Sequence, residues 1–429
     1  MGANGESPRK LFQLALGERF LQLQWSPDGE RIAYLKSRTD GDKSETVVET
    51  VPMTGGTSSS TIISDPGLRS FCWSSDGRMI YSMQEPAPND QDMNLWELQV
   101  EPSGAKASGG PRRITNWAGL SLMDLSVSLD GKHLVFVNAG FQSDLYVARL
   151  EAKNRLGLPR RLTLEGRNNL PSAWTPDGQE LFFYSDRNGN LDIFKQRLQE
   201  RHAQDFVFGP GEQTEPRLSP DGSWVLYWDY VGKGTRASAP IRLLRVPIAG
   251  GAPEFVLEAS RGAAVRCAPG HSPCALSELD RVNSELVFTT FDPLRGRLGE
   301  MVRLATSPVG SPAWDLSSDG STVAIVDLDE RKDRIRLVEL ENGSARSIGV
   351  GRSERLSGIS WSSDGRSWFV TSSSLRGAAA VLQVRLKGAV SELWTTSTNL
   401  VAPLASPDGK NLAFSTSTYN SNAWVIENF

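Results

Sequence analysis

One short stretch carries oxygen-bearing side chains at alternate positions, as a calcium-binding loop does. These residues are Asp186, Asn188, Asn190 and Asp192, and carboxylate and amide oxygens are ligands that Ca²⁺ accepts. The Glu that completes an EF-hand loop is missing downstream. Asn188-Gly189 is also a strong hairpin-turn dipeptide. We therefore favour a hairpin turn over a metal site at these four candidate ligands, and we expect no cofactor elsewhere in the chain.

Two of the three cysteines flank a short turn. Cys267 and Cys274 are separated by Ala-Pro-Gly-His-Ser-Pro, and their sulfurs would face each other if this turn closes a hairpin. A disulfide, two free thiols and a metal site with His271 are all open, although two Cys and one His leave a zinc site one ligand short. A disulfide would indicate a non-cytosolic compartment. The third cysteine, Cys72, stands beside Trp73 in a predicted strand. We expect it to be buried as a small hydrophobic residue.

The histidines give no sign of catalysis. The chain has three, His133, His202 and His271, and none accompanies a Gly-x-Ser-x-Gly nucleophile elbow or a His-Glu-x-x-His zinc signature. Distant loops could bring together a pair of carboxylates of the kind that glycosidases use, but nothing in the sequence selects one pair. We therefore predict no catalytic residue and a protein that is not an enzyme.

The elements that position these residues follow from a repeat. Eight times, Ser or Thr is followed by one residue, by Asp-Gly and by an apolar run. Asp-Gly favours a tight turn between two strands, because Gly adopts positive φ at no steric cost and Asp bonds its local backbone. We predict a structural role in these turns for Asp28, Asp76, Asp130, Asp177, Asp221, Asp319, Asp364 and Asp408.

The strand after each turn is apolar on both faces. In all eight copies the third and fourth residues after the Gly are apolar, as in Leu181-Phe182 and Val225-Leu226. A strand with one solvent-exposed face would alternate apolar and polar residues. Each sheet must therefore lie between two others, which a ring of small sheets packed face to face achieves and a two-sheet sandwich does not.

The spacing of the turn aspartates gives the number of units. Successive distances are 48, 54, 47, 44, 98, 45 and 44 residues, close to the length of a four-stranded propeller blade. The double interval predicts one degenerate unit with strands at Ala264–Ala268, Cys274–Glu278, Glu285–Phe291 and Glu300–Leu304. We thus predict an all-β fold, a single β-propeller of four-stranded blades with nine repeat units, or eight blades as the alternative.

The chain ends indicate how such a ring would close. The last unit ends at Trp424–Phe429, its expected third strand, and lacks a fourth. Lys10–Ala15 could supply that strand and protect the sheet edges. We expect residues 1–9 to be disordered and residues 10–429 to form the propeller.

Composition argues against several functions. The formal net charge is −4, from 46 basic and 50 acidic residues, whereas nucleic-acid binders carry a basic excess or stripe. No apolar run is long enough to span a membrane. The N-terminus has no apolar signal-peptide core, and Glu6 stands where the myristoylation pattern has Ser or Thr. If the sequence is taken as the whole protein, these features predict a cytoplasmic location. As a segment of a longer chain it could be periplasmic or otherwise extracytoplasmic.

The repeat resembles the PD40 repeat, a WD40-like propeller unit named for its Ser-Pro-Asp-Gly turn and typical of TolB-type propellers. The best copies are Trp25–Tyr34 and Trp174–Phe194. A narrower resemblance links this chain to the propeller modules that follow winged-helix or Ser/Thr kinase domains in bacterial proteins. It rests on Cys267 with Cys274–Glu278, and on Leu286–Pro293, Trp314–Gly320 and Ser421–Phe429. The resemblance implies a propeller over almost the whole chain and a sensor or interaction role. It is weak for function, because this fold hosts many functions.

These features predict a non-catalytic binding or sensor module, the regulatory part of a bacterial signalling or transcription-regulating system. Its partner would be a protein, peptide or small ligand at the channel or the loop face, with no nucleic acid, and we expect a monomer. The resemblance leaves two alternatives. One is a propeller enzyme or a gating domain of a peptidase or carbohydrate-active enzyme, and the other is a TolB-like periplasmic scaffold. We expect function where the repeat breaks, such as the Cys267–Cys274 turn and the channel loops.

Overall fold

In the computed structural model of the chain, the described residues form strands and no helix. They therefore contain no helix that is long and apolar enough to cross a membrane. They divide into two compact units. Of the described residues, those from 10 to 140 and from 419 to 429 belong to unit 1, and those from 141 to 230 and from 240 to 418 belong to unit 2. The structure describes residues 10–40, 43–54, 59–85, 92–101, 104, 106–117, 120–151, 155–164, 166–230, 240–270, 273–280, 282–306, 312–326, 333–351, 354–374 and 378–429.

Local hydrogen bonds build each Asp-Gly turn. The Thr175 hydroxyl donates to Asp177 Oδ1 at 2.6 Å, and the Gln179 N–H donates to the same oxygen at 3.0 Å. All eight turn aspartates accept the backbone N–H of the residue two positions on. Such contacts join near neighbours in the chain, so each turn forms from its own sequence.

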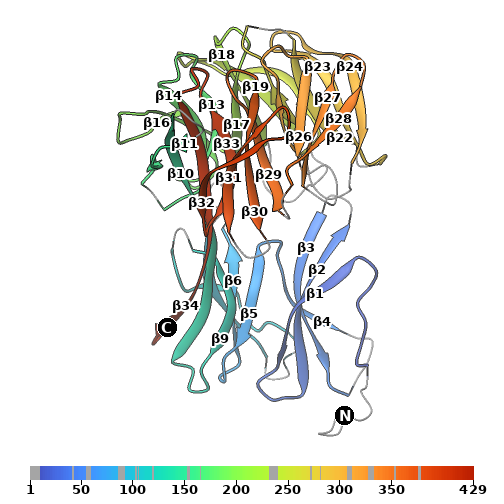
Figure 1. The fold of residues 1–429 in the computed structure, drawn as a ribbon. Coiled ribbons are helices and arrows are strands. Elements are labelled where there is room, and N and C mark those ends of the chain that lie inside the picture. The colour runs from blue at the N-terminus through green and yellow to red at the C-terminus, as the bar shows by residue number, and fades with distance from the viewer. Residues whose placement is uncertain are drawn as a thin grey trace. The chain divides into compact units, whose positions relative to one another are not determined.

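Among its described residues, unit 2 contains six antiparallel sheets, five of which consist of four consecutive strands. Figure 1 labels many of these strands. These strands are β13 (Asn169–Trp174), β14 (Glu180–Ser185), β15 (Asp192–Arg197) and β16 (Gln204–Val207); β17 (Glu212–Leu218), β18 (Trp224–Tyr230), β19 (Ile241–Pro247) and β20 (Glu254–Ala259); β21 (Ala264–Arg266), β22 (Cys274–Asp280), β23 (Glu285–Asp292) and β24 (Gly296–Ala305); β25 (Ala313–Leu316), β26 (Thr322–Val326), β27 (Arg334–Glu339) and β28 (Ala345–Gly349); β29 (Glu354–Trp361), β30 (Ser367–Ser374), β31 (Ala379–Arg385) and β32 (Val390–Thr396). The β21–β24 sheet confirms the predicted degenerate unit.

The sixth sheet of unit 2 combines distant parts of the chain. β33 (Asn399–Ala405) pairs with the first part of β34 (Asn411–Glu427), and β34 pairs with β10 (His133–Glu151). In unit 2 the Leu150 N–H of β10 donates to the Lys410 carbonyl at 2.7 Å. The outer edge of this sheet is formed by β11 (Arg155–Leu156) and β12 (Arg160–Arg161).

Apolar clusters join the six sheets of unit 2 into a closed ring. Each of six buried clusters contains residues of two neighbouring sheets. For example, Phe182 of β14 packs with Tyr227 of β18, and Trp174 of β13 packs with Ala413 of β34. Five clusters join each sheet to the next, from the β13–β16 sheet to the sixth sheet. The remaining cluster joins the sixth sheet to the β13–β16 sheet and so closes the ring. This arrangement is that of a six-bladed β-propeller.

Unit 1 contains three sheets among the described residues. Its first two are four-stranded, and the third consists of β9 with the first part of β10 and the last part of β34. One apolar cluster joins the first sheet to the second, and another joins the second to the third. The strands are β1 (Glu18–Trp25), β2 (Arg31–Asp40), β3 (Lys43–Pro52) and β4 (Ser60–Ser64); β5 (Leu68–Trp73), β6 (Arg78–Gln84), β7 (Met93–Gln99) and β8 (Arg112–Arg113); and β9 (Leu122–Val127).

The predicted single ring of nine or eight blades is therefore not what the described residues form. The repeat units around Asp130 and Asp408 each continue as one long strand, β10 and β34, where the sequence predicted a turn and a new strand. In β34 the chain between the two predicted strands has no Gly or Pro to make that turn. The repeat around Asp130 and the repeat around Asp408 thus share the strands β10 and β34. The parts of these two strands in unit 2 belong to its sixth sheet, and the parts in unit 1 belong to its third sheet.

The predicted ring closure by the N-terminus is also wrong. Lys10–Ala15 lies outside any strand, and the first strand, β1, begins at Glu18. The strands that close unit 2 are instead β33 and β34, paired with β10. Residues 1–9, which we expected to be disordered, lie outside the described residues.

Candidate functional site

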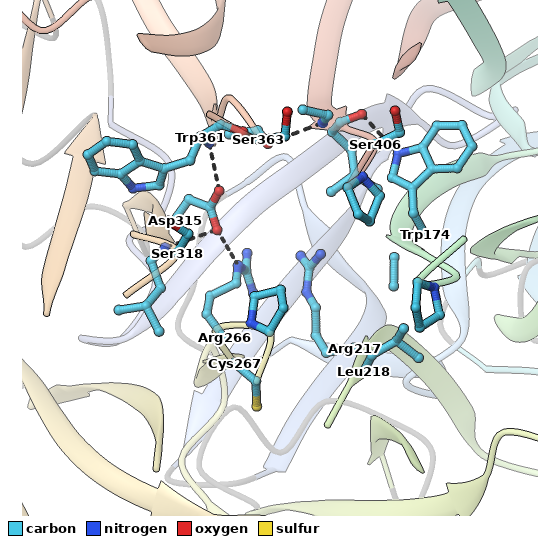
Figure 2. A pocket seen from close by; sticks show the side chains of 18 of the residues that line it. Trp174, Arg217, Leu218, Arg266, Cys267, Asp315, Ser318, Trp361, Ser363 and Ser406 are labelled. Atoms are coloured by element: carbon cyan, nitrogen blue, oxygen red, sulfur yellow. Dashed lines mark hydrogen bonds and ion pairs between the residues drawn. The ribbon is translucent and has the colours of Figure 1, made fainter. Parts of the chain in front are cut away.

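A cavity lies on the axis of the unit 2 ring. Its volume is about 490 Å³, and residues of all six sheets line it (Figure 2). A second cavity of about 300 Å³ shares lining residues with it, so both belong to one channel. The shared residues are Ser172, Arg217, Arg266, Asp315, Ser360 and Leu404.

The turns of the repeat form part of the wall of the larger cavity. Six residues from these turns or their equivalents line the cavity. Five of them stand between Ser or Thr and Asp-Gly, and the sixth follows β21 in the degenerate unit. Each sheet of the ring contributes one. They are Pro176, Pro220, Pro269, Ser318, Ser363 and Pro407. Sequence reasoning assigned these turns a structural role alone. The residue between Ser or Thr and Asp-Gly could have been noticed in the sequence, because its type varies from copy to copy. It can be recognised as a cavity-lining residue only when the arrangement of the sheets in a ring is known.

Strand β17 carries two charged residues into the channel wall through a β-bulge. Its pairing with β18 shifts register between Thr214 and Arg217, and Glu215 adopts a positive φ of 49°. Bulges re-aim side chains in this way. Arg217 points into the cavity in Figure 2, and both Glu215 and Arg217 line the channel.

Arg266 lies between two carboxylates in the same channel. Its Nε is 3.9 Å from Asp315 Oδ1, and its Nη1 is 3.9 Å from Glu215 Oε2. The guanidinium also lies 5.3 Å from the centre of the Trp314 ring. Asp315 is held by backbone donors, with the Trp361 N–H 2.8 Å from Oδ2 and the Leu316 N–H 3.0 Å from Oδ1. Arg266 thus lies beside a carboxylate that backbone donors hold in place.

Arg217 has fewer partners. Its Nη1 donates to the Ser172 carbonyl, whereas its Nε is buried with no hydrogen-bond partner among the described residues. Burial, and then the nearby Arg266 charge, lower the pKa of Arg217 to about 10. The side chain stays protonated near neutral pH, so the channel holds a cation whose donors are only partly used.

Burial also raises the pKa of two acidic groups in the channel. The pKa of Asp315 is above its usual value because the effect of burial is larger than the opposing effects of Arg266 and the Trp361 N–H. The phenol of Tyr184, on β14, is shifted upward for the same reason. The low polarity that causes these shifts also strengthens any charge interaction made inside the channel.

Tryptophans form the apolar part of the wall. Trp174 and Trp361 line the larger cavity, and Trp314 lines the smaller one. The Trp174 Nε1–H donates to the Leu404 carbonyl of β33 at 3.1 Å. This bond joins the β13–β16 sheet to the sheet that closes the ring.

The candidate calcium loop uses its oxygens within the protein. Asp186 accepts from the Asn168 N–H at 2.8 Å, and Asn188 Nδ2 donates to Asp192 Oδ2 at 3.2 Å. Asn190 donates to the Gly209 carbonyl at 2.9 Å. The structure places these residues in a turn rather than around one point. Within the described ranges no group of three or more His, Cys, Asp or Glu side chains could hold a metal ion.

Cys267 and Cys274 are joined by a disulfide, with a Cα–Cα distance of 4.3 Å. Cys267 lines the larger cavity, so this break in the repeat does reach the channel. His271 lies outside the described residues, and neither His133 nor His202 lines either cavity.

The turn aspartates share one electrostatic property. All eight have a pKa below the usual Asp value. For Asp177 the Thr175 hydroxyl is the main cause, followed by the Gln179 N–H. For Asp76 and Asp408, burial opposes the lowering that their hydrogen bonds produce.

Comparisons with known proteins found similarity over part of the chain. No protein-family model matches the chain. The chain is 29% identical over 161 residues to the Tol-Pal system protein TolB of Francisella tularensis subsp. tularensis, covering 36% of this chain and 33% of TolB. An uncharacterized protein of Agrobacterium fabrum is 26% identical over 109 residues, or 25% of this chain and 34% of that protein. The chain spans about a third of the length of these curated relatives.

Among solved structures, an oligogalacturonate lyase in complex with manganese is 14% identical, with a TM-score of 0.41 over 68% of this chain and 76% of the lyase. The sheet topology and the ring of apolar clusters define the class of this chain as an all-β protein with a β-propeller in unit 2, and one part of the chain is similar to TolB.

Proposed function

We propose that this protein is a non-catalytic binding module that takes an extended peptide segment or a small ligand into the channel of unit 2. The observation that carries the proposal is the cavity of about 490 Å³ lined by all six sheets. Binding sites are commonly concave, mostly apolar, and equipped with a few placed polar groups. The tryptophans supply the apolar wall, and the Arg217, Arg266, Asp315 and Glu215 side chains supply the polar groups.

A substitution that fills the channel mouth tests this proposal. Ser318 is exposed and lines the cavity, so Ser318→Trp should obstruct entry while leaving the Ser-x-Asp-Gly turn intact. Short random peptides displayed on phage would be selected on the wild-type protein. We expect the enriched peptides to lose at least tenfold in affinity for the Ser318→Trp variant.

Ser75→Trp is the matched control, because Ser75 is exposed and occupies the same position of the repeat in unit 1. Peptide binding should be unchanged in this variant. Enriched peptides that bind wild type and Ser318→Trp equally would place the binding surface elsewhere and reject the proposal.

We also propose that the protein works in an oxidising, extracytoplasmic compartment rather than the cytoplasm. The disulfide between Cys267 and Cys274 supports this, because such bonds rarely persist in the cytosol. Thiol counting on denatured protein from its native host tests it. One reactive thiol, from Cys72, is expected, and three would favour the cytoplasm.

The sensor role in a bacterial regulatory system is a further part of the proposal, supported by the resemblance of the repeat. The genomic reading frame around the coding sequence tests it. A winged-helix or kinase segment in the same frame would support the regulatory role, and a hydrolase segment would favour the gating-domain alternative.

A further inference from the structure

We propose that Arg217 anchors a carboxylate of the ligand, so that the channel selects peptides with an acidic side chain or a free C-terminus inside it. This inference rests on the proposed function and adds the chemistry of the ligand. It starts from the four charged side chains that line the smaller cavity, namely Glu215, Arg217, Arg266 and Asp315.

The two arginines differ in how they are compensated. Arg266 has carboxylate oxygens of Asp315 and Glu215 at 3.9 Å on two sides, and its Nη1 donates to the Val265 carbonyl at 2.8 Å. Arg217 has the neutral Ser172 carbonyl as its hydrogen-bond acceptor, and its Nε lies buried without one among the described residues. Glu215 and Asp315 lie 3.9 Å from Arg266 and also act electrostatically on Arg217, for which no ion pair is found among the described residues. The Arg217 end of the cluster is therefore the more cationic one.

A buried donor without an acceptor is costly, and a guanidinium bonds carboxylates through two parallel N–H groups. Figure 2 shows Arg217 and Arg266 pointing side by side into the open cavity. An anion placed in the cavity against the Arg217 guanidinium would pair with a charge that has a neutral carbonyl as its hydrogen-bond acceptor. It would also relieve the repulsion between two neighbouring guanidinium groups.

The acidic residues restrict the charge of that anion. Asp315 and Glu215 line the same cavity as Arg217, so a doubly charged phosphate would meet two carboxylates in a medium of low polarity. A singly charged carboxylate meets half of that repulsion and fits the planar fork of the arginine. The chemistry therefore favours a carboxylate.

The apolar wall indicates what the carboxylate is attached to. Trp174, Trp361 and Leu218 line the larger cavity, which shares Arg217 with the smaller one. A ligand with its acid on Arg217 would place the adjoining groups against these side chains. A peptide with apolar residues next to the acid matches this surface, whereas a free inorganic anion would leave it unused.

The test uses the full chain and the peptide enriched by phage selection on wild type. The peptide is synthesised in two forms, with its acid intact and with that acid replaced by the amide, and dissociation constants are measured by fluorescence anisotropy. We expect the acid form to bind wild type roughly tenfold to a hundredfold more tightly than the amide form. Arg217→Gln should remove this difference, and Arg217→Lys should retain part of it.

Arg197→Gln is the matched control, since Arg197 is an exposed arginine of unit 2 that lines neither cavity. It should preserve the preference for the acid. Thermal unfolding of each variant checks that the fold is intact, and Arg217→Lys keeps the test decisive if Arg217→Gln unfolds.

Equal binding of the two peptide forms to wild type, or an equal loss for both in Arg217→Gln, would overturn the carboxylate anchor while leaving the binding module in place. Peptides that ignore the Ser318→Trp obstruction would instead reject the proposed function, and the anchor with it.

Discussion

Trp174 and Trp25 occupy the same position of the repeat in the two units, yet they meet different surroundings. Trp174, in unit 2, is 4% exposed and bonds to the neighbouring β33. Trp25, in unit 1, is 56% exposed, and Leu23 of the same strand is equally exposed. The motif therefore determines the turn beside each tryptophan, whereas burial depends on whether another sheet covers that strand.

The turn glycines show the same difference. Gly222 of unit 2 and Gly29 of unit 1 both adopt positive φ, at 70° and 72°. A Cβ on Gly222 would lie 3.0 Å from Pro176 Cγ in the preceding sheet, whereas a Cβ on Gly29 would meet nothing within 4 Å. In the closed ring the glycine thus serves two purposes, since it makes the turn and admits the neighbouring turn. In the first sheet of unit 1 only the turn requires it.

The strongest test of this comparison replaces the two tryptophans. Trp174→Ala should cost about 3–5 kcal/mol of unfolding free energy, because it empties a buried site between two sheets. Trp25→Ala should cost under about 1 kcal/mol, because much of that ring already faces solvent. Urea unfolding followed by circular dichroism measures both. Similar losses would mean that Trp25 is covered in solution.

Removing the disulfide should affect unit 2 and spare unit 1. The Cys267→Ser, Cys274→Ser double variant loses a short covalent loop, for which chain entropy predicts about 2.5 kcal/mol. Hydrogen exchange of the β21–β24 sheet should accelerate.

Cys72 reports on unit 1 in the same variant. It is the remaining cysteine, it lies in β5, and burial raises its thiol pKa to about 12, so labelling requires this region to open. We expect its labelling rate by a maleimide to stay unchanged. A parallel rise in labelling would show that the two units unfold together.

The turn glycines give a smaller difference. Gly222→Ala and Gly29→Ala both force a Cβ into positive φ, which costs about 1–2 kcal/mol. Gly222→Ala should cost about 1 kcal/mol more, because the rigid ring of Pro176 must also move. Thermal unfolding of the pair measures this excess. Equal shifts would mean that the turns of adjacent sheets are not in contact.

Acid should act on both units alike and give the smallest effect per site. The turn aspartates have lower pKa values in the folded chain. They stabilise it above the unfolded Asp value near 4, and this contribution is lost as the pH falls through the lower folded values. Many carboxylates face solvent, so each contributes modestly. Asp28→Asn and Asp177→Asn should both flatten the loss of stability below about pH 4, as urea titrations at several pH values would measure.

Much of the fold was predictable because the repeat is local. The turn at Asp177 and the degenerate β21–β24 sheet required the spacing of residues and no knowledge of the whole. The shared strands were not predictable in this way. The lack of Gly and Pro around Tyr419 was the available signal in β34, whereas β10 has Gly140 at the corresponding place, and the pairing depends on which distant strand is available.

The site was harder to predict than the fold. The sequence drew attention to Asp186–Asp192, where oxygens gather along the chain, but those side chains bond to the surrounding protein. Arg217, Arg266 and Asp315 belong to three different sheets, and no sequence motif marked them as functional residues. Their proximity arises because the first strands of these sheets surround one axis. Cys267 is the exception, since a visible break in the repeat did lie at the channel.

The sequence by itself determined the Asp-Gly turns and the spacing of the repeat, because these depend on φ preferences and hydrogen bonds between near neighbours. The tertiary structure alone decided that six sheets close in unit 2 and three pack together in unit 1. Closure depends on contacts such as that between Trp174 and Leu404, which are 230 residues apart, and such pairings are selected by competition among similar strands across the whole chain.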